Sequence, residues 1–430
     1  MRISTNTMYA LGIATIQQQQ SELVKLQQQV STGRRILTPA DDPVAAARAL
    51  EVSQSVAVTQ QFNSNASNAN DALSLEESVL GSITGSIQDI RSLVVTAGNA
   101  GLNDADRKSL ATELQGKYQE LLGYANGTDG SGQFLFSGYK GTTTPFTETA
   151  PGTVAYNGDD GQRLAQISAS RLLPTNDAGS DIFMRIKNSS ATFTTAAAVT
   201  NKGGGAISNG VVTDATKWNT AVNSKDFTVR FDVTLGVTTY DIVDNLNNVS
   251  LLTGAAPAAG PYLRAYAGST TVSLKTQSPP DTSLTPFDYG AEFTMSGAPV
   301  NGDSFTVKAS ATQDLFTTVS SVITALQTPL TPGSGNTALV KRLNDTLSNL
   351  DNSLSNVLKV RSSVGARLNE LDSVQASGAD LLLQHQQVLS KLQDVDLAKA
   401  ISDLTQGQTT LQAAQKSFLA VSGLSLFNYM

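Results

Sequence analysis

Residues 347–392 read LSNLDNSLSNVLKVRSSVGARLNELDSVQASGADLLLQHQQVLSKL. Apolar side chains recur in this stretch at alternating steps of three and four residues, the heptad spacing of a helix that packs along one face. The stretch therefore predicts one long helix within a bundle or coiled coil. The positions on this heptad frame are Leu347, Leu350, Leu354, Val357, Arg361, Val364, Leu368, Leu371, Gln375, Gly378, Leu382, His385, Leu389 and Leu392.

The two ends of the chain carry similar stripes, called seams below. The C-terminal seam is Leu397, Ile401, Leu404, Leu411 and Phe418, and the N-terminal seam is Tyr9, Ile13, Ile16, Gln20, Leu23, Gln27 and Val30. Gly33 is expected to end the N-terminal helix. A second long helix is predicted over residues 44–96, with Asp42 as its N-cap and Pro43 in its first turn. A third is predicted from Asn103 or Asp104 to about Tyr124.

The middle of the chain is rich in Gly, Thr, Val and Pro and is expected to be β-rich. Alternating polar and apolar residues predict one hairpin from residues 227–235 and 238–243. A second hairpin is predicted from Phe293–Met295 and Phe305–Lys308. The remaining expectations are strands at Gln133–Phe136 and Val154–Tyr156, loops at Thr192–Ser208 and Ala255–Gly260, and a hairpin turn at Asp159–Asp160.

Helical ends flank a β insert, so the predicted fold is mainly α with a β-rich domain inserted between the termini. Both termini are expected to form one long antiparallel helical bundle or coiled coil, because the terminal stripes are too narrow to be stable alone. Three domains are predicted. They are residues 1–42 with 394–430 as a terminal coiled coil (inner domain), 43–156 with 335–393 as a helical rod with a β-hairpin, and 157–334 as an outer β insert.

Charge and composition limit the classes of partner. The formal net charge is −7, and lysine and arginine are scattered rather than gathered into a basic stripe, so no nucleic-acid partner is expected. No stretch approaches the ~20 apolar residues of a membrane span. Residues 1–20 lack the pattern of a cleaved Sec leader, and the chain has no cysteine. It is expected either to stay in the cytoplasm or to leave by a route without leader cleavage.

The candidate chemical sites are all better explained structurally. His385 is the sole histidine and falls on the heptad frame, and Gly127–Gly132 lacks the lysine and following helix of a phosphate loop. Asp104, Asp106 and Glu113 lack the spacing of an EF-hand calcium loop, and they suit the N-terminal part of the third helix instead. Asp41–Asp42 is favoured as a cap over a cation site. No enzyme activity, catalytic residue, cofactor or metal is therefore predicted.

The terminal seams are instead the predicted assembly interface. Most amphipathic stripes are internal core, but these seams run to the chain ends and include glutamines, so a pair within one chain would be marginal. A seam shared with other subunits is therefore favoured. The residues expected to carry assembly are Ile13, Ile16, Leu23, Val30, Leu397, Ile401, Leu404, Leu411 and Phe418.

Four segments resemble the flagellin-like axial proteins of bacterial flagella. Met1–Met8 and Ser31–Ala46 are similar to segments of the wider family. Within the second of these, the sequence Thr38–Pro43 is similar to hook-associated protein type 3 (FlgL). Gly132–Tyr139 and Leu424–Met430 are similar to the same family. The resemblance covers roughly residues 1–156 and 335–430.

The resemblance implies a structural adaptor at the hook–filament junction. Implied partners are hook-associated protein type 1, flagellin, copies of the chain itself in a ring and an export chaperone. It further implies an extracellular location in the flagellum, reached unfolded through type III export without a cleaved signal peptide. A flagellin is the alternative within the family, and a surface ligand-binding protein using the β insert is the alternative from another class.

Overall fold

The computed structural model describes residues 5–188, 192–198, 200–220, 224–329 and 335–423. They separate into two compact units. The terminal unit comprises the described residues within 1–68, 166–172 and 371–430, and the central unit those within 69–165 and 173–370. The three-domain division stays a prediction. The α-helices are α1 (Thr5–Thr32), α2 (Pro43–Ala97), α3 (Asp104–Ala125), α4 (Ala215–Trp218), α5 (Leu315–Gln327), α6 (Gly335–Gln393) and α7 (Leu397–Gly423), and a short π-helix, η1, spans Ser180–Met184.

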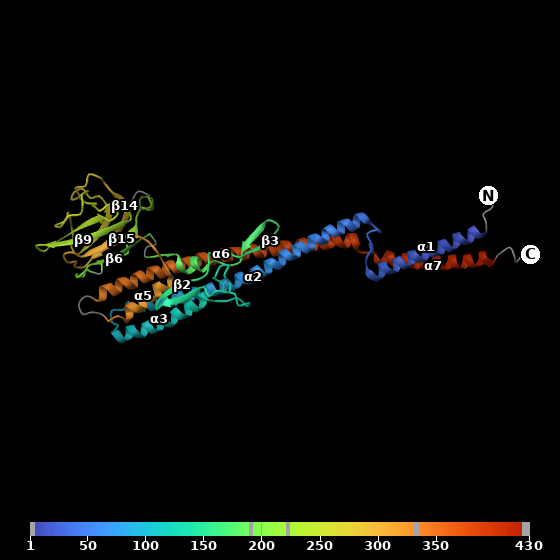
Figure 1. The fold of residues 1–430 in the computed structure, drawn as a ribbon, viewed down its shortest axis with the longest axis horizontal. Helices are drawn as coiled ribbons and strands as arrows, with labels where there is room; N and C mark the ends of the chain where they lie inside the picture. Colours follow the sequence, from blue (N-terminus) through green and yellow to red (C-terminus); the bar gives the residue numbers. More distant parts are fainter. Residues whose placement is uncertain (1–4, 189–191, 199, 221–223, 330–334, 424–430) are drawn as a thin grey trace, which may run out of the picture. The chain divides into compact units, whose positions relative to one another are not determined.

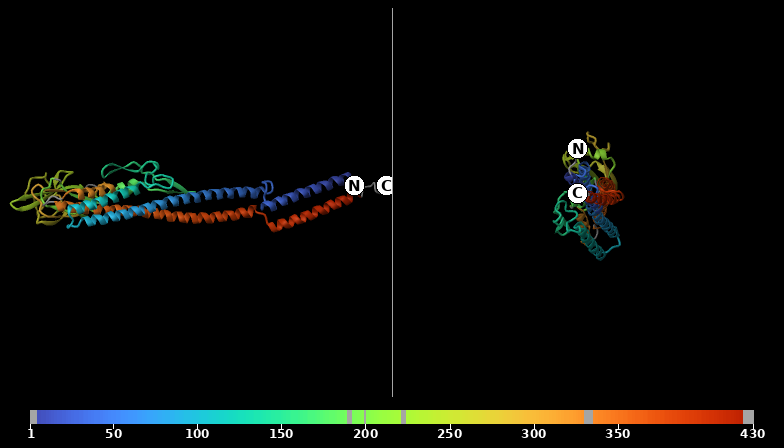
Figure 2. Two further views of the ribbon diagram at one scale, coloured as in Figure 1. Left: turned by 90° about the horizontal axis from the view of Figure 1, so that it is seen from below. Right: turned by 90° about the vertical axis from the view of Figure 1, so that its right-hand side faces the viewer.

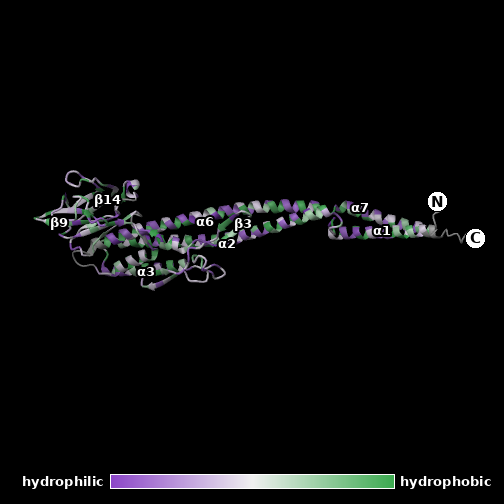
Figure 3. Ribbon diagram, turned by 45° about the horizontal axis from the view of Figure 1, so that its top comes forward, coloured by the Kyte–Doolittle hydropathy of each residue, from purple (hydrophilic) through white to green (hydrophobic). Residues whose placement is uncertain are grey.

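The long predicted helices are confirmed. Leu350, Val357, Val364 and Leu371 on the heptad frame are fully buried in α6. Apolar and polar residues alternate along α2 and α6 (Figure 3). In the terminal unit, α1 runs antiparallel to α7, and the two lie side by side (Figures 1 and 2). Among the described residues, no helix is long and apolar enough to span a membrane.

The predicted helix caps are confirmed as well. Gly33 follows α1 with a φ of 69°, a left-handed conformation that favours glycine and stops the helix. The Asp42 carboxylate accepts the Ala45 N–H at 3.0 Å, and Pro43 opens α2. Asn103 and Asp106 form a reciprocal capping box at the start of α3.

The sixteen strands of the described residues form five sheets. They are β1 (Phe146–Ala150), β2 (Thr153–Tyr156), β3 (Leu164–Ser168), β4 (Arg171–Pro174), β5 (Ile186–Lys187), β6 (Phe193–Ala197), β7 (Ala206–Ile207), β8 (Val211–Val212), β9 (Asp226–Thr234), β10 (Val237–Asp244), β11 (Val249–Ser250), β12 (Arg264–Ala265), β13 (Ser269–Lys275), β14 (Asp288–Ser296), β15 (Ser304–Ala309) and β16 (Thr312–Gln313).

Two of these sheets form the β domain, defined here as the described residues from 192 to 310. One has the order β11-β10-β9-β15-β6, with β12 also paired to β10; the other has β13-β14-β7, with β8 also paired to β14. The β9–β10 hairpin is confirmed by eight residue pairs, from Val237 opposite Thr234 to Asp244 opposite Phe227. The strand at Val154–Tyr156 is confirmed as β2, and Ala255–Gly260 lacks regular structure, as expected.

The second predicted hairpin is wrong, because β14 and β15 belong to different sheets. Gly297 and Gly302 between them have φ values of 82° and 85°, and the Gly302 N–H already bonds the Phe231 carbonyl of β9, in the sheet to which β15 belongs. The segment therefore crosses from one sheet to the other instead of turning back. Phe293 and Phe305 still share the core between the sheets.

Three further local predictions fail. Gln133–Phe136 is no strand, because the Phe134 and Leu135 N–H groups bond two different segments, at Gly141 and Gly127. Thr192–Ser208 contains β6 and β7, because Phe193, Thr195 and Ile207 are buried there and the strands pair with β15 and β14. Asp159–Asp160 is no hairpin turn, because the flanking strands β2 and β3 do not pair with each other.

Helix α5 was not predicted and lies within the range expected to be β insert. Asp314 caps it by accepting the Thr317 N–H at 2.6 Å. One face buries Leu315, Phe316 and Val319 against α3, where the rings of Phe316 and Tyr118 meet edge to face with their centroids 6.3 Å apart. The spacing of these apolar residues is helical, so the sequence did carry the signal.

A buried carboxyl group stabilises the packing of α2 against the segment after β4. Glu76 is 1% exposed and accepts the Asp177 N–H at 3.1 Å, while Asp177 pairs with Arg367 of α6. Burial raises the pKa of Glu76 to about 8, and the nearby Asp177 carboxylate acts in the same direction. Glu76 is therefore protonated in the folded protein at neutral pH.

Replacing Glu76 by glutamine should make the central unit less sensitive to alkali. The folded pKa lies above the unfolded value, so the proton's contribution to stability is complete below about pH 4.5 and is lost as pH rises through about 8. Glu76→Gln should gain on the order of 2–4 kcal/mol over the parent at pH 9 and little at pH 4. Thermal unfolding from pH 4 to 9 measures this, with Glu77→Gln as the control. Parallel pH profiles for parent and variant would contradict it.

Candidate assembly surface

The α1–α7 pair closes its seam within one chain. The half-buried positions that follow the seam are Tyr9, Gly12, Ile16, Gln19, Leu23, Leu26 and Val30 on α1, and Leu404, Gly407, Leu411, Ala414 and Phe418 on α7, with buried Ala400 at the far end. Tyr9 and Phe418 meet edge to face, with ring centroids 6.0 Å apart. The seam residues of one helix therefore pack on those of the other, as in an antiparallel coiled coil.

The structure divides the nine predicted interface residues into two groups. Ile16, Leu23, Val30, Leu404, Leu411 and Phe418 lie in the seam. Ile13, Leu397 and Ile401 are instead 47%, 51% and 52% exposed. The predicted N-terminal seam was shifted by one residue at alternate steps, because Gln20 and Gln27 are also exposed, while Gln19 and Leu26 take the seam positions.

Gly12 is a seam residue that the heptad pattern did not indicate. A Cβ atom there would lie 2.8 Å from Cδ2 of Phe418, so the glycine makes room for the aromatic ring. The available signal was a large side chain, Phe418, near the opposite end of the chain.

Adding one methyl group at each seam glycine should therefore have opposite effects. Gly12→Ala should lower the unfolding midpoint of the terminal unit, because the new methyl group displaces Phe418. Gly407→Ala should raise the midpoint, because alanine favours the helix over glycine by about 1 kcal/mol. The new methyl group also fits, since its nearest atoms would be Leu23 Cδ1 and Leu26 Cδ1, both at 4.0 Å. Circular dichroism during heating measures both variants. Equal shifts of the same sign would contradict the packing.

One side of the α1–α7 pair carries no charge. In an antiparallel pair, the residues that follow the inner heptad positions of the two helices flank the seam on the same side. We call this side the uncharged flank; its exposed residues are Ile13, Gln20, Val24, Gln27, Ile401, Gln408, Gln415 and Leu419. The other flank carries Glu22, Lys25, Lys399 and Asp403. An apolar side rimmed by glutamine is suited to burial against another helix.

The terminal unit exposes more large apolar side chains than it buries. Among its described residues only six apolar ones are buried, four of them alanines: Ala45, Ala49, Ala66, Ile167, Leu371 and Ala400. Thirteen large ones are exposed: Leu11, Ile13, Val24, Val44, Leu50, Val58, Leu172, Leu381, Leu383, Val388, Leu397, Ile401 and Leu419. Such a surface gains burial only when other chains cover it.

The segment between α1 and α2 forms a corner with the segment between α6 and α7. The Arg35 N–H donates to the Gln393 carbonyl at 2.6 Å, and the Val395 N–H donates to the Gly33 carbonyl at 2.9 Å. Lys25 pairs with Asp41 at 2.7 Å, and this bond holds the pKa of Asp41 well below its usual range. The Ser31–Ala46 motif thus joins the two helical pairs of the terminal unit.

The other candidate sites have structural surroundings. His385 lies half-buried on α6, and Asp129 organises the Gly127–Gly132 turn by accepting the Ser131 and Gln133 N–H groups. Asp104 and Asp106 lie in the first turn of α3. Within the described ranges, no three metal-ligating side chains come together. The motif Leu424–Met430 and the first four residues of Met1–Met8 lie outside the described residues.

Comparison with known proteins gives one consistent result. A family model described as the bacterial flagellin N-terminal helical region matches residues 3–141. The flagellar hook-associated protein 3 of Escherichia coli (strain K12) is 31% identical over 428 residues, covering 99% of each chain. The flagellar junction protein FlgL from Legionella pneumophila superposes with a TM-score of 0.65 at 29% identity, covering 81% of this chain and 100% of that one. The phase 1 flagellin of Salmonella naestved is 28% identical over 135 residues, only 31% of this chain and 27% of its own length.

Proposed function

Because this chain belongs to the flagellar hook-associated protein 3 family, we propose that it is a structural subunit that joins the hook-associated ring to the flagellin filament. The observation that carries this proposal is a similarity that extends over 99% of both chains. The flagellin alternative is weaker, because the sequence similarity to the phase 1 flagellin covers only 31% of this chain. The relatives are structural proteins, and the same role is proposed here.

Assembly supplies the burial that the terminal unit lacks. The α1–α7 seam is satisfied within one chain, so the surface left for neighbouring subunits is the uncharged flank, which includes Ile13, Ile401 and Leu419. Leu397 adds a further exposed apolar side chain at the start of α7. Copies of the chain in a ring cover this flank, and burial of its apolar surface drives the association. The faces of that ring bind hook-associated protein type 1 on one side and flagellin on the other.

The chain reaches this place through the flagellar export channel without leader cleavage. It contains no cysteine, so no disulfide has to form or break during passage as an unfolded chain. The exposed apolar flank would associate prematurely in the cytoplasm, which gives an export chaperone its role there. The subunit folds and assembles at the distal end of the hook.

Electron microscopy of cells that lack the protein tests this function. Such cells should carry complete hooks without filaments and should release flagellin into the medium, and the parent gene should restore filaments. Immunogold labelling in the parent strain should mark one narrow band at the base of the filament. Normal filaments in the deletion strain, or label along the whole filament, would overturn the proposal.

A further inference from the structure

The β domain closes its hydrophobic core without any residue of α6. Its buried cluster runs from Phe193 to Val307 and includes Trp218, Phe231 and Phe293. All the described residues of this cluster belong to the β domain. The packing that holds the two sheets together therefore does not determine how the domain lies on the helix.

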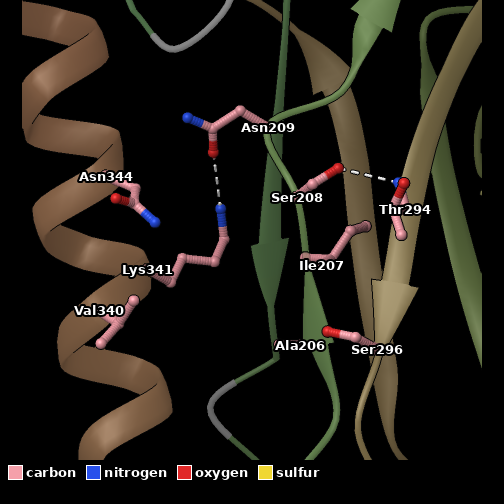
Figure 4. Close-up of a pocket in the computed structure, with 9 residues that line it drawn as sticks. All are labelled: Ala206, Ile207, Ser208, Asn209, Thr294, Ser296, Val340, Lys341 and Asn344. Atoms are coloured by element: carbon pink, nitrogen blue, oxygen red, sulfur yellow. Dashed lines mark hydrogen bonds between the residues drawn. The ribbon is translucent and has the colours of Figure 1, made fainter. Parts of the chain in front are cut away.

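A group of side-chain hydrogen bonds centred on one lysine joins the β domain to α6. The Lys341 ammonium donates to Thr195 Oγ1 at 3.3 Å, to Asn209 Oδ1 at 3.2 Å and to Asp345 Oδ1 at 3.0 Å. The Asn209 amide also donates to Ser348 Oγ at 3.1 Å. Figure 4 shows Lys341 reaching from α6 to Asn209 on the β domain. Its side chain is only 16% exposed.

A cavity of about 560 Å³ lies beside this lysine. Ile207 and Ser296 line it from the β domain, and Val340 and Asn344 line it from α6 (Figure 4). Apolar side chains that face an open cavity make few dispersion contacts across it. The joint between the β domain and α6 is therefore weakly packed, and the lysine hydrogen bonds carry much of its specificity.

The covalent connection between the β domain and the helices is a narrow neck. The neck consists of β5 and β16, in which Lys187 pairs with Thr312 and Ile186 with Gln313. The Asn188 N–H continues the pairing to the Ala311 carbonyl at 3.1 Å. A short two-stranded neck fixes the distance between two bodies but resists twisting poorly.

We propose that the β domain is a hinged module and that Lys341 is the latch that fixes its orientation on α6. When the latch is broken, the domain turns on the neck while both sheets stay folded. The orientation is thus set by a few exchangeable hydrogen bonds, which a neighbouring subunit could replace. The inference does not depend on the identity of the assembly partners.

Spin labels can report this orientation. The chain has no native cysteine, so two introduced cysteines are the only sites that take the label. Labels at Thr271→Cys, an exposed position of β13, and at Lys359→Cys, an exposed position of α6, report the distance between the domain and the helix by double electron–electron resonance. The latched protein should give one narrow distance distribution. Lys341→Met should at least double its width. Arg342→Met, which removes the adjacent exposed cation, should leave the width unchanged.

A second variant separates latch release from damage by an unpaired carboxylate. Burial raises the pKa of Asp345, so Lys341→Met alone leaves an unfavourable group behind. Lys341→Met combined with Asp345→Asn removes both charges and should broaden the distribution equally. Fluorescence of Trp218, the sole tryptophan, should stay unchanged in both variants. An unbroadened distribution in either variant, or loss of the Trp218 signal, would overturn the proposal.

Discussion

Replacing Ile401 by aspartate should abolish incorporation of the subunit while leaving the free protein folded. Ile401 is 52% exposed on the uncharged flank, so an aspartate there disturbs no packing within the chain. In the assembly the same carboxylate would be buried against a neighbouring helix, at a cost of several kcal/mol for each interface. Cells that carry Ile401→Asp should secrete the protein, show the parent helix content by circular dichroism and lack filaments.

Two variants on the same helix make this result specific. Gln406→Asp places the same charge on the flank that already carries Lys399 and Asp403, and filaments should remain. Leu411→Asp charges the seam itself, so it should lower helix content in the free protein and also prevent filaments. Wild-type motility in Ile401→Asp, or a loss of helix content equal to that of Leu411→Asp, would contradict the division between seam and flank.

The fold was largely predictable where one period dominates the sequence. The α6 frame repeats over more than forty residues, so single departures such as Arg361 did not obscure it. Helix caps were predictable for another reason: Asp42 and Asn103 act on N–H groups within three residues of themselves. Local chemistry and long repeats are both written in contiguous sequence.

The errors occurred where distant residues decide the outcome. β14 and β15 are close in sequence, but β14 also pairs with β7 and β8, and β15 pairs with β9 and β6, all of them far back along the chain. The seam of α1 depends on Phe418, which lies about four hundred residues away and determines that Gly12 faces inward. The period alone allowed either Gly12 or Ile13 in the seam, and the partner helix selects the glycine. The sequence therefore identified the helices that form the candidate assembly surface, but not which of their faces stays exposed.

The β domain contains one buried ion pair whose disruption should have the largest effect on its stability. Arg264 and Asp281 are 2% and 0% exposed at their side chains. Arg264 donates to both oxygens of Asp281, at 2.9 and 2.6 Å, and also to the Lys275 carbonyl at 2.7 Å. The Gln277 N–H donates to the same carboxylate at 2.8 Å. The pair thus links β12 to the segment that follows β13.

Asp281→Asn should destabilise the β domain by about 3–5 kcal/mol, because it leaves the buried Arg264 guanidinium without its counter-charge. Urea unfolding of the full chain, followed by Trp218 fluorescence, should show a midpoint well below that of the parent. Lys217→Met is the matched control, because it breaks an ion pair with Asp288 whose side chains are 48% and 42% exposed, and it should have no measurable effect. Arg264→Met with Asp281→Leu should recover most of the loss, since no charge stays buried. An Asp281→Asn midpoint equal to that of the control would show that water reaches the pair and that the sheets do not depend on it.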